Sequence, residues 1–283
     1  MPIGWYPGHM NKARKDITKT IARVDAVIEI VDARLPYSSE NPLIHTIMGA
    51  TPRLKVLNKA DLADPEVTRQ WLNYYQENNI KAVALEKTQT SKIRELATSC
   101  YREFKKPEKR RFSIMILGIP NVGKSTLMNI LLDKKVAKVG NEPAVTKTRQ
   151  EIELNESISL LDTPGILWPK IEDQNSAYRL AATGAIKNTA IEFEDIALYT
   201  VEFLRDHYPA LLQERYQLES LDEEPVAILE QIGSKRGCLR KGGVDFTKTG
   251  EVLLNDLRTA KIGLISFEKP EEILSGTETP KHD

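Results

Sequence analysis

The segment from Gly118 to Ser125 constrains the fold more than any other part of this chain. It reads GIPNVGKS and matches the phosphate-binding pattern G-x-x-x-x-G-K-[ST]. The apolar run FSIMILG (112–118) predicts a buried strand before it, and KSTLMNILL predicts a helix after it. A phosphate loop needs this context, because backbone N–H groups of the turn and the helix N-terminus together bind phosphate oxygens. The sequence therefore predicts an α/β fold that holds a nucleotide.

Two side chains of this loop carry chemistry that the backbone cannot supply. Lys124 can neutralise β- and γ-phosphate oxygens, and the Ser125 hydroxyl can bind Mg²⁺. A chance glycine-rich turn is a poor alternative, because the strand and helix patterns flank the motif in the right order. The other loop residues that we expect at the nucleotide are Pro120, Asn121, Val122, Gly123 and Thr126.

The turn DTPG (162–165) follows another apolar run, ISLL, and adds groups for the metal and the γ-phosphate. The Asp162 carboxylate can hold the Mg²⁺ shell, and the Gly165 N–H can contact the γ-phosphate. Between the two motifs, a loop offers a hydroxyl to the metal, with Thr146 as the first choice and Thr148 as the alternative. Either threonine taken singly could instead belong to an ordinary polar loop.

A third motif, Asn58-Lys59-Ala60-Asp61, is suited to reading a base. A carboxylate at Asp61 can accept hydrogen bonds from N1–H and the exocyclic N2 amine of guanine, a donor pair that adenine lacks. Taken alone, Asp61 could be a helix N-cap; in a chain with a phosphate loop, guanine recognition is favoured. Ordinary GTPases carry this motif after the phosphate loop. Its position before Gly118 predicts a circularly permuted GTPase.

The chain divides near residue 172 into two parts with different patterns. In the first part, β-branched runs alternate with helical patterns, which predicts a doubly wound, mostly parallel sheet of about six strands. In the second part, 176–190, 194–206, 223–235 and 247–260 read as helices, and none of it reads convincingly as a strand. We therefore expect a nucleotide-binding domain over 1–172 with an internal charged hinge at 105–111. A small all-α domain over 173–283 follows, with a frayed tail after Pro270.

Composition narrows the class of protein further. The 40 basic and 40 acidic residues give no net charge, so any site for a polyanion must come from local clusters. The two cysteines, Cys100 and Cys238, have no metal-ligand spacing, which favours reduced thiols. No apolar run approaches the roughly 20 residues that span a bilayer, and the first ten residues do not resemble a signal peptide. We expect a cytoplasmic protein with no membrane partner.

Two clusters of basic residues are candidates for contact with a polyanion. Residues 1–20 carry four basic side chains against one acid, and 234–241 carry four and no acid. The second cluster lies beside three glycines, where backbone can approach a phosphate closely. On composition alone, a solvated helix end is the simpler interpretation. The candidate residues are Lys12, Arg14, Lys15, Lys235, Arg236, Arg240 and Lys241.

Six motifs recur together, in this order, in one known family. They are GWYPGHMNKAR (4–14), DARLP (32–36), NKAD (58–61), GIPNVGKST (118–126), DTPGILWPK (162–170) and RGCLRKGG (236–243). From residue 4 to about residue 267, the chain resembles the ribosome biogenesis GTPase A family of circularly permuted GTPases. The resemblance implies a GTPase domain and a helical RNA-binding domain that act on a late precursor of the large (50S-type) ribosomal subunit. It further implies contacts to rRNA and ribosomal proteins, hydrolysis stimulated by the ribosome and timing release, and a monomer off the ribosome.

The group that orients the attacking water is not evident from the usual position. Many GTPases place a glutamine directly after DxxG, but Ile166 stands there and cannot hydrogen-bond water. The resemblance implies that His9 takes this role when the ribosome docks its loop inward, and a neutral imidazole suits such chemistry near pH 7. A lone histidine in an N-terminal loop is usually structural, and this alternative stays open. The resemblance also implies that Asn121 helps to bind K⁺, which would act as an arginine finger does elsewhere.

Two positions depart from the family's pattern. Ala144 stands where the family has glycine before the switch threonine, and Leu85-Glu86 stand where a Ser-Ala turn backs the guanine. Neither departure removes a catalytic group, for which we take His9, Lys124 and Thr146, and Leu85 and Glu86 stay candidates for nucleotide contact. Two other functions are open alternatives: an RNA-binding module that uses GTP only as an affinity switch, and a signalling GTPase with a protein partner.

Overall fold

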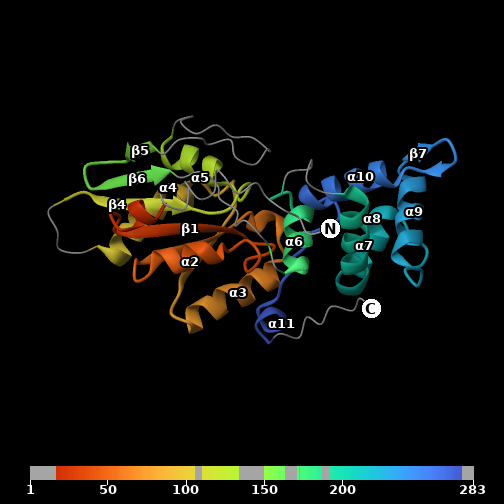
Figure 1. Ribbon diagram of the computed structural model, residues 1–283, viewed down its shortest axis with the longest axis horizontal. Helices are drawn as coiled ribbons and strands as arrows, with labels where there is room; N and C mark the ends of the chain where they lie inside the picture. Colours follow the sequence, from red (N-terminus) through yellow and green to blue (C-terminus); the bar gives the residue numbers. More distant parts are fainter. Residues whose placement is uncertain are drawn as a thin grey trace.

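The chain forms a six-stranded sheet with helices on both faces, followed by a group of helices (Figure 1). The computed structural model describes residues 17–105, 110–133, 150–162, 171, 173–186 and 192–275. Along the sheet, the strand order is β3-β2-β1-β4-β6-β5. The strands are β1 (Ala26–Asp32), β2 (Arg53–Asn58), β3 (Lys81–Leu85), β4 (Phe112–Leu117), β5 (Gln150–Glu153) and β6 (Ile158–Asp162). All neighbouring pairs are parallel except β5 and β6. The predicted mostly parallel α/β sheet of about six strands is confirmed.

The sheet is buried on both faces, which explains why β1 reads as a continuous run of buried residues. One face packs on α4 (Thr90–Phe104) and α5 (Lys124–Leu131), through side chains such as Ile28 and Ile114. The other face packs on the helical residues 17–21, α2 (Pro42–Met48) and α3 (Pro65–Glu77). Since successive strand residues point to opposite faces, both faces need apolar side chains.

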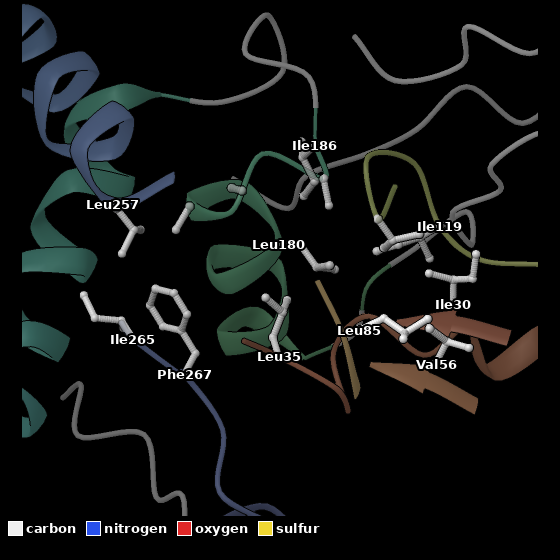
Figure 2. Packing of buried hydrophobic residues seen from close by; sticks show 14 of the residues in the cluster. Ile30, Leu35, Val56, Leu85, Ile119, Leu180, Ile186, Leu257, Ile265 and Phe267 are labelled. Carbon is white, nitrogen blue, oxygen red and sulfur yellow. The ribbon is translucent and has the colours of Figure 1, made fainter. Parts of the chain in front are cut away.

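The second part of the chain is mainly helical and lies beside one end of the sheet (Figure 1). Its helices are α6 (Gln174–Ala182), α7 (Phe193–His207), α8 (Pro209–Tyr216), α9 (Pro225–Lys235), α10 (Phe246–Arg258) and α11 (Pro270–Leu274). One hydrophobic cluster joins the sheet to these helices and includes Leu35, Leu180, Leu257, Ile265 and Phe267 (Figure 2). The domain boundary near residue 172 stays a prediction.

Four features of the second part differ from the expectation. The helix expected over 176–190 is α6, which ends at Ala182 and is followed by a turn over 183–186. A short hairpin of β7 (Leu239–Arg240) and β8 (Gly243–Val244) stands where no strand was expected, because two-residue strands are too short to show alternation. Helix α8 was missed, since Pro209 begins it directly after α7 ends. The segment after Pro270 forms α11 and contacts α3, so residues 270–274 are helical and not a frayed tail.

The described residues include both cysteines and all the helices named above, so they bear on the expected thiols and on membrane spans. Cys100 and Cys238 are both free and buried, and burial raises the pKa of Cys100 to about 12. Every helix in the described ranges is too short or too polar to span a bilayer.

Candidate functional site

The carboxyl ends of the parallel strands bring the sequence motifs to one edge of the sheet. Asp32 at the end of β1 pairs in register with Asn58, and Asn58 pairs with Leu85 at the end of β3. Across the other half of the sheet, Ile116 of β4 pairs with Asp162 of β6. The chain runs outward from β1 to one side and from β4 to the other, so the strand order reverses between these two neighbours. Open α/β sheets bind ligands at such a reversal.

The phosphate loop occupies this reversal point, between β4 and α5. Lys124 is buried, and its Nζ donates to the carbonyls of Gly118 at 3.0 Å and Ile119 at 2.9 Å. A Cβ on Gly118 would lie 2.5 Å from the carbonyl oxygen of Ile30, so only glycine fits this close approach to β1. The loop thus curls around its own lysine, which lies beside the backbone where phosphates are expected.

The base motif and the phosphate loop are in direct contact. Asn58 Nδ2 donates to the Val122 carbonyl at 2.6 Å. Gly123, with φ of +97°, permits this contact, because a Cβ there would lie 2.3 Å from Asn58 Nδ2. Asn58 therefore joins the two motifs, which lie 64 residues apart between Asn58 and Val122.

A pocket of about 210 Å³ opens between these two motifs. Asp61 lies in η1 (Ala60–Leu62), a single 3₁₀ turn at its rim. The pocket is lined by the polar residues Asn58, Lys59, Asp61, Lys87 and Thr126, by Gly123, and by the apolar residues Leu62, Ile93, Leu127 and Ile130. Apolar walls with a few convergent polar groups are typical of a site for a planar base.

The loop after β3 contributes a residue that the sequence did not single out. Leu85 is buried in the core cluster, and Glu86 is half-buried beside it. The pocket is instead lined by Lys87, two residues beyond the register pair of Leu85 with Asn58. In this loop Lys87 lines the pocket, whereas contact of Leu85 and Glu86 with the nucleotide stays a prediction.

Lys59 is held by a buried carboxylate for which the sequence suggested no role. Its Nζ lies 3.0 Å from Asp32 Oδ2, and Asp32 also accepts from Arg34 Nε at 2.9 Å and Nη2 at 2.8 Å. Burial opposes ionisation of Asp32, but the two cations outweigh it and hold its pKa far below the usual range. Burial lowers the pKa of Lys59, against the attraction of Asp32. The DARLP motif contained the signal, since its carboxylate ends a buried strand and an arginine follows two residues later.

Asn121 lies in the phosphate loop with a left-handed backbone at φ of 60°. Its Nδ2 donates to the Gly184 carbonyl at 2.6 Å, just beyond the end of α6. Arg258 of α10 donates to two carbonyls at the same helix end, those of Ala181 at 2.7 Å and Ala182 at 2.8 Å. The phosphate loop is thus joined to the helical part through the end of α6.

The basic cluster at 235–241 separates into two pairs. Lys235 Nζ donates to the Gln217 carbonyl at 2.5 Å, and Arg236 Nη2 donates to the Arg215 carbonyl at 2.9 Å, at the C-terminal end of α8. Arg240 and Lys241 lie at the exposed turn of the β7–β8 hairpin. All four residues are exposed, but the first pair bonds to carbonyls at a helix end, whereas the second pair lies at a hairpin turn.

Several expected site residues lie outside the described residues. They are His9, Lys12, Arg14, Lys15, Thr146 and Gly165, with the alternative Thr148.

Comparison with known proteins gives the family of the chain. The family model for the RsgA GTPase matches residues 10–172, and the model for the 50S ribosome-binding GTPase matches residues 113–235. The chain is 47% identical to ribosome biogenesis GTPase A of Priestia megaterium, covering 96% of this chain and 98% of that one. It is 46% identical to the Bacillus cereus protein of the same name, over 96% and 95%. The chain belongs to the ribosome biogenesis GTPase A family.

Solved structures agree with this assignment. A GDP-bound YlqF structure is similar with a TM-score of 0.67 and 27% identity, covering 90% of this chain and 99% of that one. GNP-bound YlqF from T. maritima has a TM-score of 0.65 at 26% identity, covering 92% of this chain and 99% of that one.

The mouse mitochondrial ribosome-associated GTPase 1 is a more distant relative by sequence, 34% identical over 88% of this chain and 80% of its own. As a member of this family, the protein is a GTPase.

GTPases with a phosphate loop use Mg²⁺, and the residues here fit that ion. Ser125 lies in the first turn of α5, and Asp162 ends β6 in register with Ile116 of the neighbouring β4. Hydroxyl and carboxylate oxygens are the ligands that Mg²⁺ prefers, and it usually takes only one or two from the protein. Ser125 would hold it together with the carboxylate of Asp162, whose side chain lies outside the described structure and whose role stays a prediction. The ion would neutralise charge on the phosphate oxygens.

Replacing Asp32 by Asn should destabilise the fold more than the loss of an exposed ion pair does. The change leaves Arg34 and Lys59 together without their carboxylate, and breaking a buried ion pair costs about 3 kcal/mol or more. Urea unfolding measures the change in the free energy of unfolding. The control is Asp133→Asn, which removes the exposed partner of Arg94 and should cost less than about 1 kcal/mol. Equal losses in both variants would contradict the role given to Asp32.

Replacing Asp61 by Asn should shift the preference of the pocket from guanine to xanthine nucleotides. The neutral amide loses a charge-assisted acceptor for guanine, so GTP affinity should fall about ten- to a hundredfold. The amide can donate to the O2 of xanthine, so xanthosine triphosphate should gain affinity. Competition binding with both nucleotides measures the exchange. A continued preference for GTP would show that Asp61 does not read the base.

Proposed function

We propose that this GTPase is an assembly factor that binds the late precursor of the large, 50S-type ribosomal subunit through rRNA. Hydrolysis of GTP, stimulated by the ribosome, times its release. The observation that carries the proposal is the near-complete coverage of relatives named for ribosome biogenesis. The phosphate loop is also hydrogen-bonded to the helical part, which carries a basic hairpin. Such a factor would be a cytoplasmic monomer off the ribosome, in contact with rRNA and ribosomal proteins.

We infer that the order of the chain is a circular permutation of the ordinary GTPase order. The strand that carries the base motif, β2, precedes the phosphate-loop strand β4, while both lie in one parallel sheet. A chain that began at β4 and passed from β6 to β1 would have the ordinary order with the same neighbours. The hinge at 105–111 would then mark the joined ends, and residues 173–283 form the RNA-binding domain.

For hydrolysis, we propose that Lys124 and Thr146 act on the phosphates and metal, and that His9 orients the water once the ribosome docks its loop. Ile166 leaves the usual position for the glutamine without a polar group. On this proposal hydrolysis is slow until the ribosome completes the site, so the catalytic role of His9 requires a partner.

The GTPase rate with and without large subunits tests this proposal. The wild type should be stimulated, and His9→Ala should lower the stimulated rate about a hundredfold, as removal of a general acid–base group does. The matched control is His207→Ala, because this exposed histidine stacks on Phe203 within the helical part. Stimulation that survives in His9→Ala would refute the role of His9, and no stimulation of the wild type would refute the function itself.

For RNA contact, we propose that the β7–β8 hairpin is the principal basic surface of the described helical part. The double variant Arg240→Glu, Lys241→Glu should weaken binding to large subunits and reduce the slope of log affinity against log salt by about 2. Binding measured at several salt concentrations gives this slope. Lys261→Glu, at the other end of α10, is the control and should leave the slope nearly unchanged. An unchanged slope in the double variant would show that the hairpin does not contact the RNA.

We also propose that Asn121 takes part in binding K⁺ next to the phosphates. The amide nitrogen of Asn121 is held by Gly184, which fixes the orientation of the amide group in the loop. A cation there would neutralise charge that builds up during phosphoryl transfer. GTPase rates in K⁺ should exceed those in Na⁺ at equal ionic strength, and equal rates would exclude the site.

A further inference from the structure

The segment 262–268, here called the strap, returns from the helical part to the sheet. It begins after α10 and leads to α11, which contacts α3 (Figure 1). Ile265 and Phe267 anchor it in the hydrophobic cluster that also contains Leu35 and Leu180 (Figure 2). No sequence motif marks this segment, although it crosses the region that carries the base motif.

The strap is hydrogen-bonded to the loop that carries Asp61. The N–H of Ile265 donates to the carbonyl of Leu62 at 3.2 Å. The hydroxyl of Ser266 accepts from the N–H of Asp64 at 3.1 Å, and Ser266 is almost fully buried. These contacts lie one and three residues beyond Asp61. They fix the backbone on the C-terminal side of the base-reading carboxylate.

The strap is also hydrogen-bonded to the loop that follows β1. The N–H of Phe267 donates to the carbonyl of Arg34 at 2.7 Å. Arg34 forms the two-point ion pair with Asp32, which in turn holds Lys59. The strap therefore bonds both to the backbone that follows Asp61 and to the backbone of Arg34, whose partner Asp32 holds Lys59.

Tyr208, between α7 and α8, connects the strap to the helical part. Its hydroxyl accepts from the N–H of Ser266 and lies 3.1 Å from the Ser266 carbonyl. It also lies 3.4 Å from Asp64 Oδ2, at the N-cap of α3. Burial raises the pKa of Tyr208 to about 12, so the hydroxyl keeps its proton and stays a donor near neutral pH.

Glu268 anchors the end of the strap. Its carboxylate is fully buried and accepts from the N–H of Tyr37 at 2.8 Å, the N–H of Ser38 at 3.1 Å and Arg179 Nη1 at 3.3 Å. Its backbone carbonyl accepts from Trp71 Nε1 of α3 at 2.8 Å. The anchor thus joins the β1 loop, α3 and α6, and it explains how a short segment can keep a fixed path.

We propose that Ser266 and Tyr208 are positioning residues for guanine recognition, which hold the loop of Asp61 so that its carboxylate can meet both N1–H and the N2 amine. A two-point hydrogen bond tolerates less movement of the carboxylate than a one-point bond. Loosening the loop should therefore weaken the nucleotide that uses both contacts more than the nucleotide that uses one. The helical part takes part in base selection through these residues, independently of any contact with the ribosome.

Binding of GDP and of inosine diphosphate, which lacks the N2 amine, tests this proposal in the full chain. Calorimetry or competition with a fluorescent GDP analogue gives both dissociation constants. For Ser266→Ala and for Tyr208→Phe, GDP affinity should fall about fivefold, the effect of one neutral hydrogen bond. Inosine diphosphate affinity should fall less than about twofold. The ratio of the two affinities, which measures the preference for GDP over inosine diphosphate, should therefore become smaller.

Tyr216→Phe is the matched control. It removes a buried hydroxyl that lies 3.3 Å from Asp256, the same chemical group within the same helical part, but away from the base loop. Its preference for GDP should equal that of the wild type. The proposal would be overturned if Ser266→Ala and Tyr208→Phe lowered the affinity for both nucleotides equally, or lowered neither. It would also be overturned if Tyr216→Phe reduced the preference for GDP over inosine diphosphate by the same amount.

Discussion

The buried carboxylate of Asp32 is the interaction on which the arrangement of the site depends. It ends β1, the strand that neighbours both halves of the sheet, and it pairs with Lys59 of the base motif and with Arg34. A buried carboxylate with two cations is stable only while all three stay together, because each alone would lose its hydration without compensation. The cost of separating them fixes the end of β1, the base motif and the segment bound to the strap as one unit.

Spatial neighbours here come from distant parts of the chain, and the sheet explains how. Parallel strands place every carboxyl end at one edge, so Asn58 can reach Val122 whichever motif comes first in the chain. The order of the strands in the chain can therefore change without moving the site. The order does determine which strand precedes the helical part. Here β6, which carries Asp162, is followed by α6, and Gly184, just beyond the end of α6, accepts a hydrogen bond from Asn121 of the phosphate loop.

The sequence predicted what depends on local pattern, namely the six strands, the phosphate loop and the base motif. It did not predict Lys87, Ser266 or Tyr208, because nothing in their neighbouring residues marks them. Ser266 matters through the N–H of Asp64, about two hundred residues earlier in the chain, and such a contact exists only after the strap has packed. The β7–β8 hairpin was missed for a different reason, because each of its strands spans only two residues, a single period of strand alternation.

The two pairs of the basic cluster show why charge counts alone do not locate a binding surface. Four cations between Lys235 and Lys241 look equivalent in the sequence, but the end of α8 presents carbonyls that a cation can satisfy. Lys235 and Arg236 do so, and the ring of Tyr216 lies 5.0 Å from the guanidinium of Arg236. A polyanion would have to compete with these contacts for the first pair. Arg240 and Lys241 lie at an exposed turn built on two glycines with positive φ, where no such helix-end carbonyls of the described residues face them, which is why the proposal of RNA contact rests on the hairpin.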